Sequence, residues 1–319
     1  MKTNGLISVV VPVRNRANIV LRTLDSIACQ TFRPLHLIIV DNNSTDSTLE
    51  TITDWARKNR NEQFGIEILQ CNKPGAPQAR NYGLATVTTP WVMFFDSDDE
   101  MRPQHIEKIA HEIQENPDCD LIYFDAAELD SDGWTNPMSV NDNDVMRGHL
   151  FHCSLSTQRM AINTNLIKQI GGWRNECKIW DDMELGVRLL LNTTNVRKLH
   201  GDPMVLVHPH DADSITGVDY RSRAGLFENT LDIIDSQFQS PEQGLQHMWV
   251  ECRRVILAAM YMRENETQRA KALLHGVLSR HNWRTRLKLR MVYIVQKLLG
   301  RGGSATSTLL FKPTKAKAK

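Results

Sequence analysis

Short apolar segments rich in β-branched residues recur along the first hundred residues. They are LISVVVPV (6–13), LHLIIVDN (35–42), FGIEILQC (64–71) and WVMFFD (91–96). Between the first two segments, residues 17–30 place apolar side chains at helical spacing. This pattern predicts a βαβ unit followed by further strands.

Helix-like segments separate the later strands as well. Residues 44–59 begin with Ser, Thr and Asp before an amphipathic run, residues 78–86 form a short helical segment, and residues 103–115 follow the fourth strand. Strands that are buried on both faces read as continuous apolar runs, as these do. We therefore expect an α/β fold in which helices cover both faces of a parallel sheet.

Beyond residue 220 the apolar spacing is helical throughout. The positions are Leu245, Met248, Trp249, Cys252, Val255, Ile256 and Met260, then Ala270, Leu273, Leu274, Val277 and Leu278. We expect a domain over residues 1–220, a helical region over 221–300 and a basic tail over 301–319. The last residues, FKPTKAKAK, have the composition of a disordered segment.

The composition is that of a folded, water-soluble protein. Of 319 residues, 41% are hydrophobic and 24% are charged, which excludes disorder of the whole chain. The six cysteines form no CxxC pair, and Met1 leads into a strand-like segment instead of a signal peptide. We expect a cytoplasmic protein without a membrane span, since no run approaches the roughly 18 apolar residues that a span needs.

The net charge of +1 hides an asymmetry. Residues 280–319 contain eleven Lys or Arg and no acid, which leaves 27 basic and 37 acidic residues before them. Residues 280–301 also carry an apolar stripe, so we expect them to bind an anionic membrane surface. A basic face that serves only solubility is the alternative, and nucleic acid is not expected because the rest of the chain supplies no basic groove.

The segment FFDSDDE (94–100) places three aspartates within four positions at the end of a predicted strand. In parallel sheets ligands bind at the carboxyl ends of the strands, where Asp41 and Asp96 both stand. Such charges repel one another unless a cation lies among them. Mg²⁺ or Mn²⁺ takes one or two carboxylates and completes its shell with phosphate oxygens, so we predict a metal-bound diphosphate. The alternatives are a solvated turn here and a helix cap after Asp41.

Two common nucleotide-binding classes are disfavoured. The chain has no GxxxxGK[ST] segment, and VPVRNRA follows the first strand where a dinucleotide-binding protein would carry GxGxxG. A P-loop ATPase and a Rossmann dehydrogenase are therefore not expected.

Four segments carry a common pattern: ISVVVPVRNRANIVLRTLDSIACQTFRPLHLIIVDNNSTDST, NKPGAPQARNYGLATVTTPWVMFFDSDDEMRP, IGGWRN and WDDMELGVRLL. Together they resemble the inverting, nucleotide-sugar-dependent family 2 glycosyltransferases of the GT-A fold. The resemblance covers about residues 5 to 218 and implies a Rossmann-like, mostly parallel sheet flanked by helices, with the C-terminal helices as an extension. The chain departs from the family at Asn42, where a second Asp is common, and at Asn43, where Gly is common.

The resemblance implies a donor site for a nucleoside-diphosphate sugar, with a UDP-sugar expected. DSD matches the family's DxD motif, which makes Asp98 a metal ligand and Asp96 a contact to the metal or the ribose. The other implied donor contacts are Asp41 to the base, Pro12, Val13 and Asn15 around a uracil-like ring, and Arg80 near the nucleotide. Bound Mn²⁺ or Mg²⁺ would neutralise the departing diphosphate.

The resemblance also implies an acceptor side. Asp182 corresponds to the general base that deprotonates the acceptor hydroxyl, and Asp181 stands where the family usually has Glu. Helical spacing places Asp181 and Glu184 on one face. Trp173 and Trp180 are expected either to stack on a sugar ring or to serve in packing.

A histidine-containing segment, VLVHPHDADSITG (205–217), resembles the family's flexible loop. His210 matches the position that contacts metal or diphosphate, with His208 beside it. Closure of such a loop over the donor would exclude water. A loop without a catalytic role is the alternative.

The expected function is metal-dependent transfer of a sugar to a glycan or lipid-linked acceptor in surface polysaccharide biosynthesis, on the cytoplasmic side and peripheral to the inner face of the membrane. A sugar-phosphate nucleotidyltransferase is one alternative, although its Gly-rich triphosphate loop is missing. A noncatalytic binding relative is the other, and the presence of Asp96, Asp98 and Asp182 together argues against it.

Overall fold

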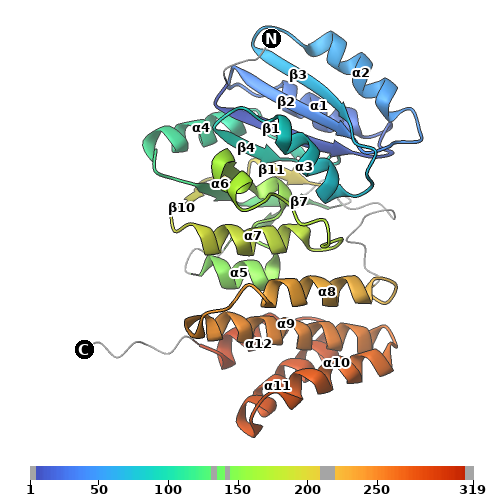
Figure 1. Ribbon diagram of the computed structural model, residues 1–319, viewed down its shortest axis with the longest axis vertical. Helices are drawn as coiled ribbons and strands as arrows, with labels where there is room; N and C mark the ends of the chain where they lie inside the picture. The colour runs from blue at the N-terminus through green and yellow to red at the C-terminus, as the bar shows by residue number, and fades with distance from the viewer. Residues whose placement is uncertain (1–4, 131–134, 141–143, 209–219, 313–319) are drawn as a thin grey trace. The chain divides into compact units, whose positions relative to one another are not determined.

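The computed structural model describes residues 5–130, 135–140, 144–208 and 220–312. The chain divides into two compact units, residues 1–145 with 153–212 and residues 146–152 with 213–319. Each unit has its own architecture (Figure 1).

The first unit is built on a seven-stranded sheet in the order β10-β6-β9-β4-β1-β2-β3. Every neighbouring pair is parallel except those that β9 makes with β4 and β6. The mostly parallel sheet predicted from the sequence is therefore confirmed. Its strands are β1 (Ile7–Val13), β2 (Leu35–Asp41), β3 (Phe64–Gln70), β4 (Trp91–Phe94), β6 (Leu121–Phe124), β9 (Met160–Asn163) and β10 (Val196–Leu199).

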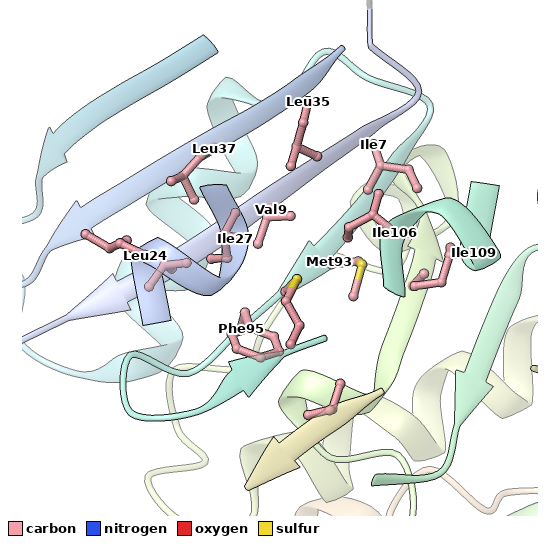
Figure 2. Packing of buried hydrophobic residues seen from close by; sticks show 14 of the residues in the cluster. Ile7, Val9, Leu24, Ile27, Leu35, Leu37, Met93, Phe95, Ile106 and Ile109 are labelled. Atoms are coloured by element: carbon pink, nitrogen blue, oxygen red, sulfur yellow. The ribbon is translucent and has the colours of Figure 1, made fainter. Parts of the chain in front are cut away.

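Helices supply buried side chains to both faces of this sheet. α1 (Val20–Ala28), α2 (Thr48–Asn59) and α4 (His105–Glu115) share one apolar cluster with alternate strand residues such as Val9 and Leu37. α3 (Ala76–Thr86), α6 (Thr164–Gln169) and α7 (Asp181–Asn192) share the other cluster with Val10 and Ile38. Figure 2 shows Leu24 and Ile27 of α1 packed over the first face. Because both faces are covered, the central strands β1 and β4 are apolar along most of their length.

A second sheet was not predicted from the sequence. It contains β5 (Glu100–Met101), β11 (Val205–Val207), β7 (Ala126–Leu129) and β8 (Thr135–Met138), in that order. These strands have two to four residues each, which is too short for a period-two pattern to stand out. The sheet places residues 100 and 206 side by side, so the last residue of the acidic segment (94–100) lies beside the start of the histidine-containing segment (205–217).

The second unit is helical in the part that the structure describes, as the spacing predicted. Residues 146–152 of α5 (Val145–His152) belong to it, together with α8 (Ala224–Asp235), α9 (Gly244–Arg263), α10 (Thr267–Ser279), α11 (Trp283–Leu299) and α12 (Gly303–Leu310). α9 packs against α8, α10, α11 and α12, and its buried residues form the centre of the unit. Among the described helices, none has the length and apolar composition that crossing a bilayer requires.

Candidate active site

The carboxyl ends of the central strands bring the first predicted residues together. Val13 pairs with Asp41 and Val10 pairs with Phe94, so Asp41 and the acidic segment lie at the same edge of the sheet. Asp41 is 4% exposed, and its Oδ2 accepts a hydrogen bond from the Ser44 N–H at 3.3 Å. Its Oδ1 is buried without a hydrogen-bond partner among the described atoms. Leaving a buried acceptor without a hydrogen-bond donor costs about 1–3 kcal/mol. A ligand that donates an N–H group to this oxygen would recover that energy.

The predicted ring-binding residues lie beside Asp41. Val13 is buried and Pro12 is half-buried. Asn15 has a left-handed backbone (φ 51°), and its side-chain oxygen accepts a hydrogen bond from the Thr45 N–H at 2.8 Å. The Asn15 amide of this structure therefore braces two loops, which leaves Pro12 and Val13 as the apolar residues next to the Asp41 carboxylate.

Asn42, a departure from the family pattern, has a structural explanation. Its Nδ2 donates to the carbonyl oxygens of Cys71 at 3.0 Å and Lys73 at 2.6 Å, and its Oδ1 accepts from the Gly75 N–H at 2.8 Å. An aspartate could accept from Gly75 but could not donate to the two carbonyls. Asn42 therefore holds the loop that leads into α3 against the end of β2.

The three aspartates of the acidic segment differ in exposure. The side chains of Asp96 and Asp98 are 31% and 30% exposed, whereas Asp99 is 2% exposed. Asp99 accepts hydrogen bonds from Gln158 Nε2 at 2.7 Å and from the His208 N–H at 3.0 Å. Burial, followed by the charges of Asp96 and Asp98, raises the pKa of Asp99 to about 8. Asp99 therefore ties the acidic segment to the end of β11, while Asp96 and Asp98 present their carboxylates.

Arg80 connects the donor-side acids with the acceptor-side acids. Its Nη2 donates to Asp96 Oδ1 at 2.9 Å and its Nη1 donates to Asp181 Oδ2 at 2.5 Å. The guanidinium carbon lies 4.4 Å from the centre of the Trp173 ring. Burial alone would lower the pKa of Arg80, but the carboxylates of Asp181 and Asp96 raise it above its ordinary value. The guanidinium is therefore a permanent positive charge between two carboxylates.

The residues that follow Arg80 explain how it is held. Asn81 Nδ2 donates to the Trp173 carbonyl at 2.7 Å, and Asn81 Oδ1 accepts from the Trp173 N–H at 2.8 Å. At Gly83, an added Cβ would lie 2.6 Å from Val10 Cγ1, so α3 can approach β1 only with glycine there. Asn81 was not predicted as a site residue, although it directly follows Arg80 in the sequence.

Trp173 and Trp180 occupy different environments. Trp173 is 1% exposed and packs edge-on against Phe94 at a centroid distance of 5.1 Å, with Arg80 over its ring. This position leaves no open face for a sugar and agrees with the packing role. Trp180 is half-buried and has a left-handed backbone conformation (φ 54°). It is the residue directly before α7.

The acids of α7 divide into two groups. Asp181 reaches Arg80, as described above, whereas Glu184 is fully buried and binds Arg188 at 2.6 Å and Arg174 at 3.1 Å. Glu184 is therefore neutralised by Arg174 and Arg188. Of the three acids in the first turn of α7, Asp181 and Asp182 lie near Arg80.

Asp182 has the electrostatics of a proton acceptor that works near neutral pH. Burial raises its pKa most, the charge of Asp181 raises it further, and a hydrogen bond with the Cys153 side chain opposes them, with a resulting pKa of about 6. One of its oxygens accepts from the Met183 N–H at 2.8 Å. A base of this strength is ionised at pH 7 and still holds a proton well during transfer.

Of the two predicted histidines, the structure describes His208, whereas His210 lies outside the described residues. His208 Nε2 lies 2.6 Å from Glu100 Oε1, and its backbone binds Asp99. His208 is therefore engaged with acids of the 99–100 segment.

The residues at this edge of the sheet can supply only part of the ligand shell of a divalent cation. Within the ranges that the structure covers, no three His, Cys, Asp or Glu side chains are gathered to hold a metal. Asp96 and Asp98 could supply one or two oxygens, as Mg²⁺ and Mn²⁺ require when phosphate oxygens and water complete the shell. The residues thus suit a metal that arrives with a phosphorylated ligand.

The family model for Glycosyl transferase family 2 matches residues 8–170. The chain belongs to glycosyltransferase family 2. The matched range includes β1, β2 and the acidic segment, together with Arg80.

Curated relatives carry related descriptions. An uncharacterized glycosyltransferase of Haemophilus influenzae is 26% identical over 190 residues, which cover 58% of this chain and 62% of that protein. The PGL/p-HBAD biosynthesis glycosyltransferase of Mycobacterium tuberculosis is 26% identical over 269 residues, which cover 81% of this chain and 95% of that protein. The chain thus spans less than two thirds of the length of the Haemophilus relative.

Solved structures share the fold. Staphylococcus aureus TarS 1–349 in complex with UDP-GlcNAc has a TM-score of 0.64 and 18% identity, with 92% of each chain covered. The mannosyltransferase PcManGT from Pyrobaculum calidifontis, in complex with GDP-Man and Mn²⁺, has a TM-score of 0.57 and 16% identity, with 96% of this chain and 85% of that chain covered. At these identities the likeness establishes the fold, which is the expected GT-A type with C-terminal helices.

Proposed function

We propose that this protein is an inverting glycosyltransferase that uses a nucleoside-diphosphate sugar. The observation that carries the proposal is the Arg80 network, in which one guanidinium holds Asp96 of the donor-side segment and Asp181 of the acceptor side. Asp182, with a pKa of about 6, stands next to that network in the chain. The proposed donor contact Asp96 is thus linked through Arg80 to the residue that precedes the proposed base, which supports direct transfer between two positioned substrates.

The proposed donor is a UDP-sugar. The unpartnered Oδ1 of Asp41 suits the N–H of a pyrimidine base, and Pro12 and Val13 supply apolar surface beside it. The TarS neighbour was solved with UDP-GlcNAc, which supports a uridine nucleotide. Arg80 contributes by fixing Asp96, so we place it in the donor site as a positioning residue and not as a direct contact to the nucleotide.

We propose Mn²⁺ or Mg²⁺ as the cofactor, with Asp98 and Asp96 as its protein ligands and His210 as a further contact to metal or diphosphate. When bound, the cation supplies positive charge that stabilises the departing nucleoside diphosphate. The Mn²⁺ in the PcManGT structure supports this choice. The exposure of Asp96 and Asp98, in contrast to the burial of Asp99, supports their selection within the acidic segment.

The proposed chemistry is a single displacement. Asp182 accepts the proton of the acceptor hydroxyl as that oxygen forms a bond to the anomeric carbon. The bond from that carbon to the diphosphate oxygen breaks, and the nucleoside diphosphate leaves from the opposite face. The configuration at the anomeric carbon is therefore inverted.

The proposed acceptor is a glycan or a lipid-linked sugar in surface polysaccharide biosynthesis. We place the enzyme on the cytoplasmic side of the membrane, at its inner face, where such an acceptor would be delivered. The family match and the relatives named above are glycosyltransferases, which favours transfer over nucleotidyl transfer. A noncatalytic relative would not need a base such as Asp182.

The test is a panel of nucleotide sugars incubated with the full chain, with and without Mn²⁺, in which the released nucleoside diphosphate is measured. We expect release from one donor class, dependence on the metal, and a product with inverted configuration. Release of pyrophosphate from a nucleoside triphosphate and a sugar phosphate would instead indicate the nucleotidyltransferase. A product that keeps the donor's configuration would contradict the single displacement.

A further inference from the structure

Helix α11 turns an apolar face outward. Its fully or largely buried residues are Leu289, Val292 and Gln296. On the opposite side lie five large apolar side chains, which we call the α11 stripe: Trp283 (68% exposed), Leu287 (56%), Met291 (47%), Ile294 (51%) and Leu298 (70%). At about 100° per residue the stripe occupies an arc of about 80°.

This concentration is unusual within the chain. Of the ten large hydrophobic side chains that are exposed among the described residues, seven lie between residues 283 and 309. Single exposed apolar residues are normal on protein surfaces, whereas a contiguous row on one helix marks an interaction surface. The second unit already buries the other side of α11 against α9, so the stripe is not needed for that packing.

Basic side chains border the stripe on both sides. By helical position, Arg284 and Lys288 follow one edge of it, and Arg286, Arg290 and Lys297 follow the other. All five are exposed, and no ion pair with a carboxylate is found for them in the part of the chain that the structure covers.

The surroundings of these cations keep their charge uncompensated. Arg286 donates to the carbonyl oxygens of His281 and Ser279, and Lys288 donates to that of Leu310. Carbonyl groups orient the two side chains without neutralising them. Arg280, by contrast, is paired with Glu251 and does not belong to this surface.

We propose that the α11 stripe and its bordering cations form a docking surface for an anionic phospholipid bilayer. The apolar row would enter the boundary between headgroups and acyl chains while the cations lie at the level of the phosphate and carboxylate groups, which is the arrangement of interfacial amphipathic helices. The inference deepens the proposed function because it places the enzyme where a lipid-linked acceptor is found. Binding itself requires no catalysis.

The charge pattern argues against two other occupants. A second copy of α11 against the first would bring like-charged borders together, which is destabilising. A nucleic acid would satisfy the cations but would leave the five apolar side chains in water. An anionic bilayer matches both parts of the surface.

The test is co-sedimentation of the full chain with vesicles of phosphatidylcholine alone or with about 30% phosphatidylserine. At low salt we expect binding to the anionic vesicles at least 10-fold tighter than to the neutral ones, and weakening at high salt because surface charges are screened within about 8 Å at physiological ionic strength. Donor binding is measured on the same preparations, so that loss of activity and loss of attachment are separable.

Paired variants isolate the two parts of the surface. Leu287→Gln with Ile294→Gln should reduce binding at least 10-fold, whereas Leu226→Gln, an exposed leucine of α8 in the same unit, should not. Arg290→Gln with Lys297→Gln should remove the preference for anionic lipid, and Lys58→Gln with Lys271→Gln removes the same charge elsewhere as a control. Thermal unfolding verifies that each variant is folded.

Three results would overturn the proposal. The full chain could ignore anionic vesicles at low salt while it binds donor normally. The stripe variants could bind vesicles as tightly as the parent chain. Sedimentation could show that the stripe variants abolish self-association instead, which would identify a second copy as the occupant.

Discussion

Arg80 and Asp181 are 101 residues apart in the sequence, yet their side chains are joined by a hydrogen bond of 2.5 Å. Asp181 is half-buried, and this partial burial raises the pKa of its carboxyl group, whereas the charge of Arg80 opposes that effect. The same guanidinium binds Asp96 at 2.9 Å. One cation thus links the segment proposed to hold the donor with the helix that carries the proposed base.

Removal of this cation should destabilise the protein. Arg80 is buried, and Arg80→Met leaves two half-buried carboxylates without their shared partner. Breaking a buried ion pair from one side costs about 3–5 kcal/mol, and the partial exposure of the two acids places the expected loss at the low end. We expect a loss of about 3 kcal/mol in the free energy of unfolding, measured with urea. Arg57→Met is the control, because its pair with Asp54 is exposed and should contribute under about 1 kcal/mol. Equal losses in the two variants would show that Arg80 is not an organising residue.

Asp182→Asn should separate chemistry from binding. The amide keeps the shape of the side chain but cannot accept the proton, so turnover should fall by roughly 10²–10⁴ while donor affinity stays nearly unchanged. Single-turnover rates and equilibrium titration with the donor measure the two quantities. Near-normal turnover in this variant would remove Asp182 from the mechanism.

The activity should depend on pH through the same residue. The pKa of Asp182 is raised to about 6 by burial and by Asp181, and a base works only when it is deprotonated. We expect kcat/KM to fall below about pH 6. In Asp181→Asn the neighbouring charge is gone, so the pKa of Asp182 should decrease and the acid limb should move to lower pH. An unchanged limb would mean that a different group titrates.

Asp98→Ala should abolish transfer while the fold is kept, since this side chain is 30% exposed and lies at the edge of the sheet. Asp96→Ala should weaken donor binding and also loosen Arg80. Treatment of the parent chain with a chelator should stop nucleotide release, and Mn²⁺ should restore it. Full activity of the Asp98 variant in excess chelator would refute the metal requirement.

Asp99 should make the stability of the metal-free protein depend on pH. Its pKa is about 8 in the folded state and about 3.9 in an unfolded chain. The folded state therefore retains a proton that the unfolded state releases, and stability should be lost as pH rises from about 4 through about 8. In Asp99→Asn this loss is absent, and Gln158 can turn its amide to keep the hydrogen bond. The difference in melting temperature between variant and parent should grow between pH 5 and pH 8, with Asp54→Asn as an exposed control.

Several features could be predicted from local sequence patterns. The strands β1 to β4 appear in the sequence as apolar runs, because a strand that is covered on both faces is apolar at most positions. The helices between them appear as helical spacing, because a helix that packs on one side is apolar only on that side. The acidic segment, its place after a strand, and the acids at the start of α7 were likewise visible from neighbouring residues.

Contacts between distant residues were decided only by the tertiary structure. β9 lies antiparallel between β4 and β6, and the second sheet has strands too short to carry a period. Arg80 binds Asp181, which is 101 residues away, and Asp96, which is 16 residues away. Trp173 is held by Asn81, 92 residues away, and is buried partly by Phe94 of β4. No local pattern contains that information.

Helix α11 illustrates the physical reason. Its sequence shows apolar residues at helical spacing, and this spacing is the same whether a face is buried or exposed. The sequence determined that α11 is an amphipathic helix with basic residues and no acid. Only the packing against α9 decided that Leu289 and Val292 are buried and that Trp283 and Leu298 face solvent, because periodicity defines a face, whereas burial depends on which neighbour covers it.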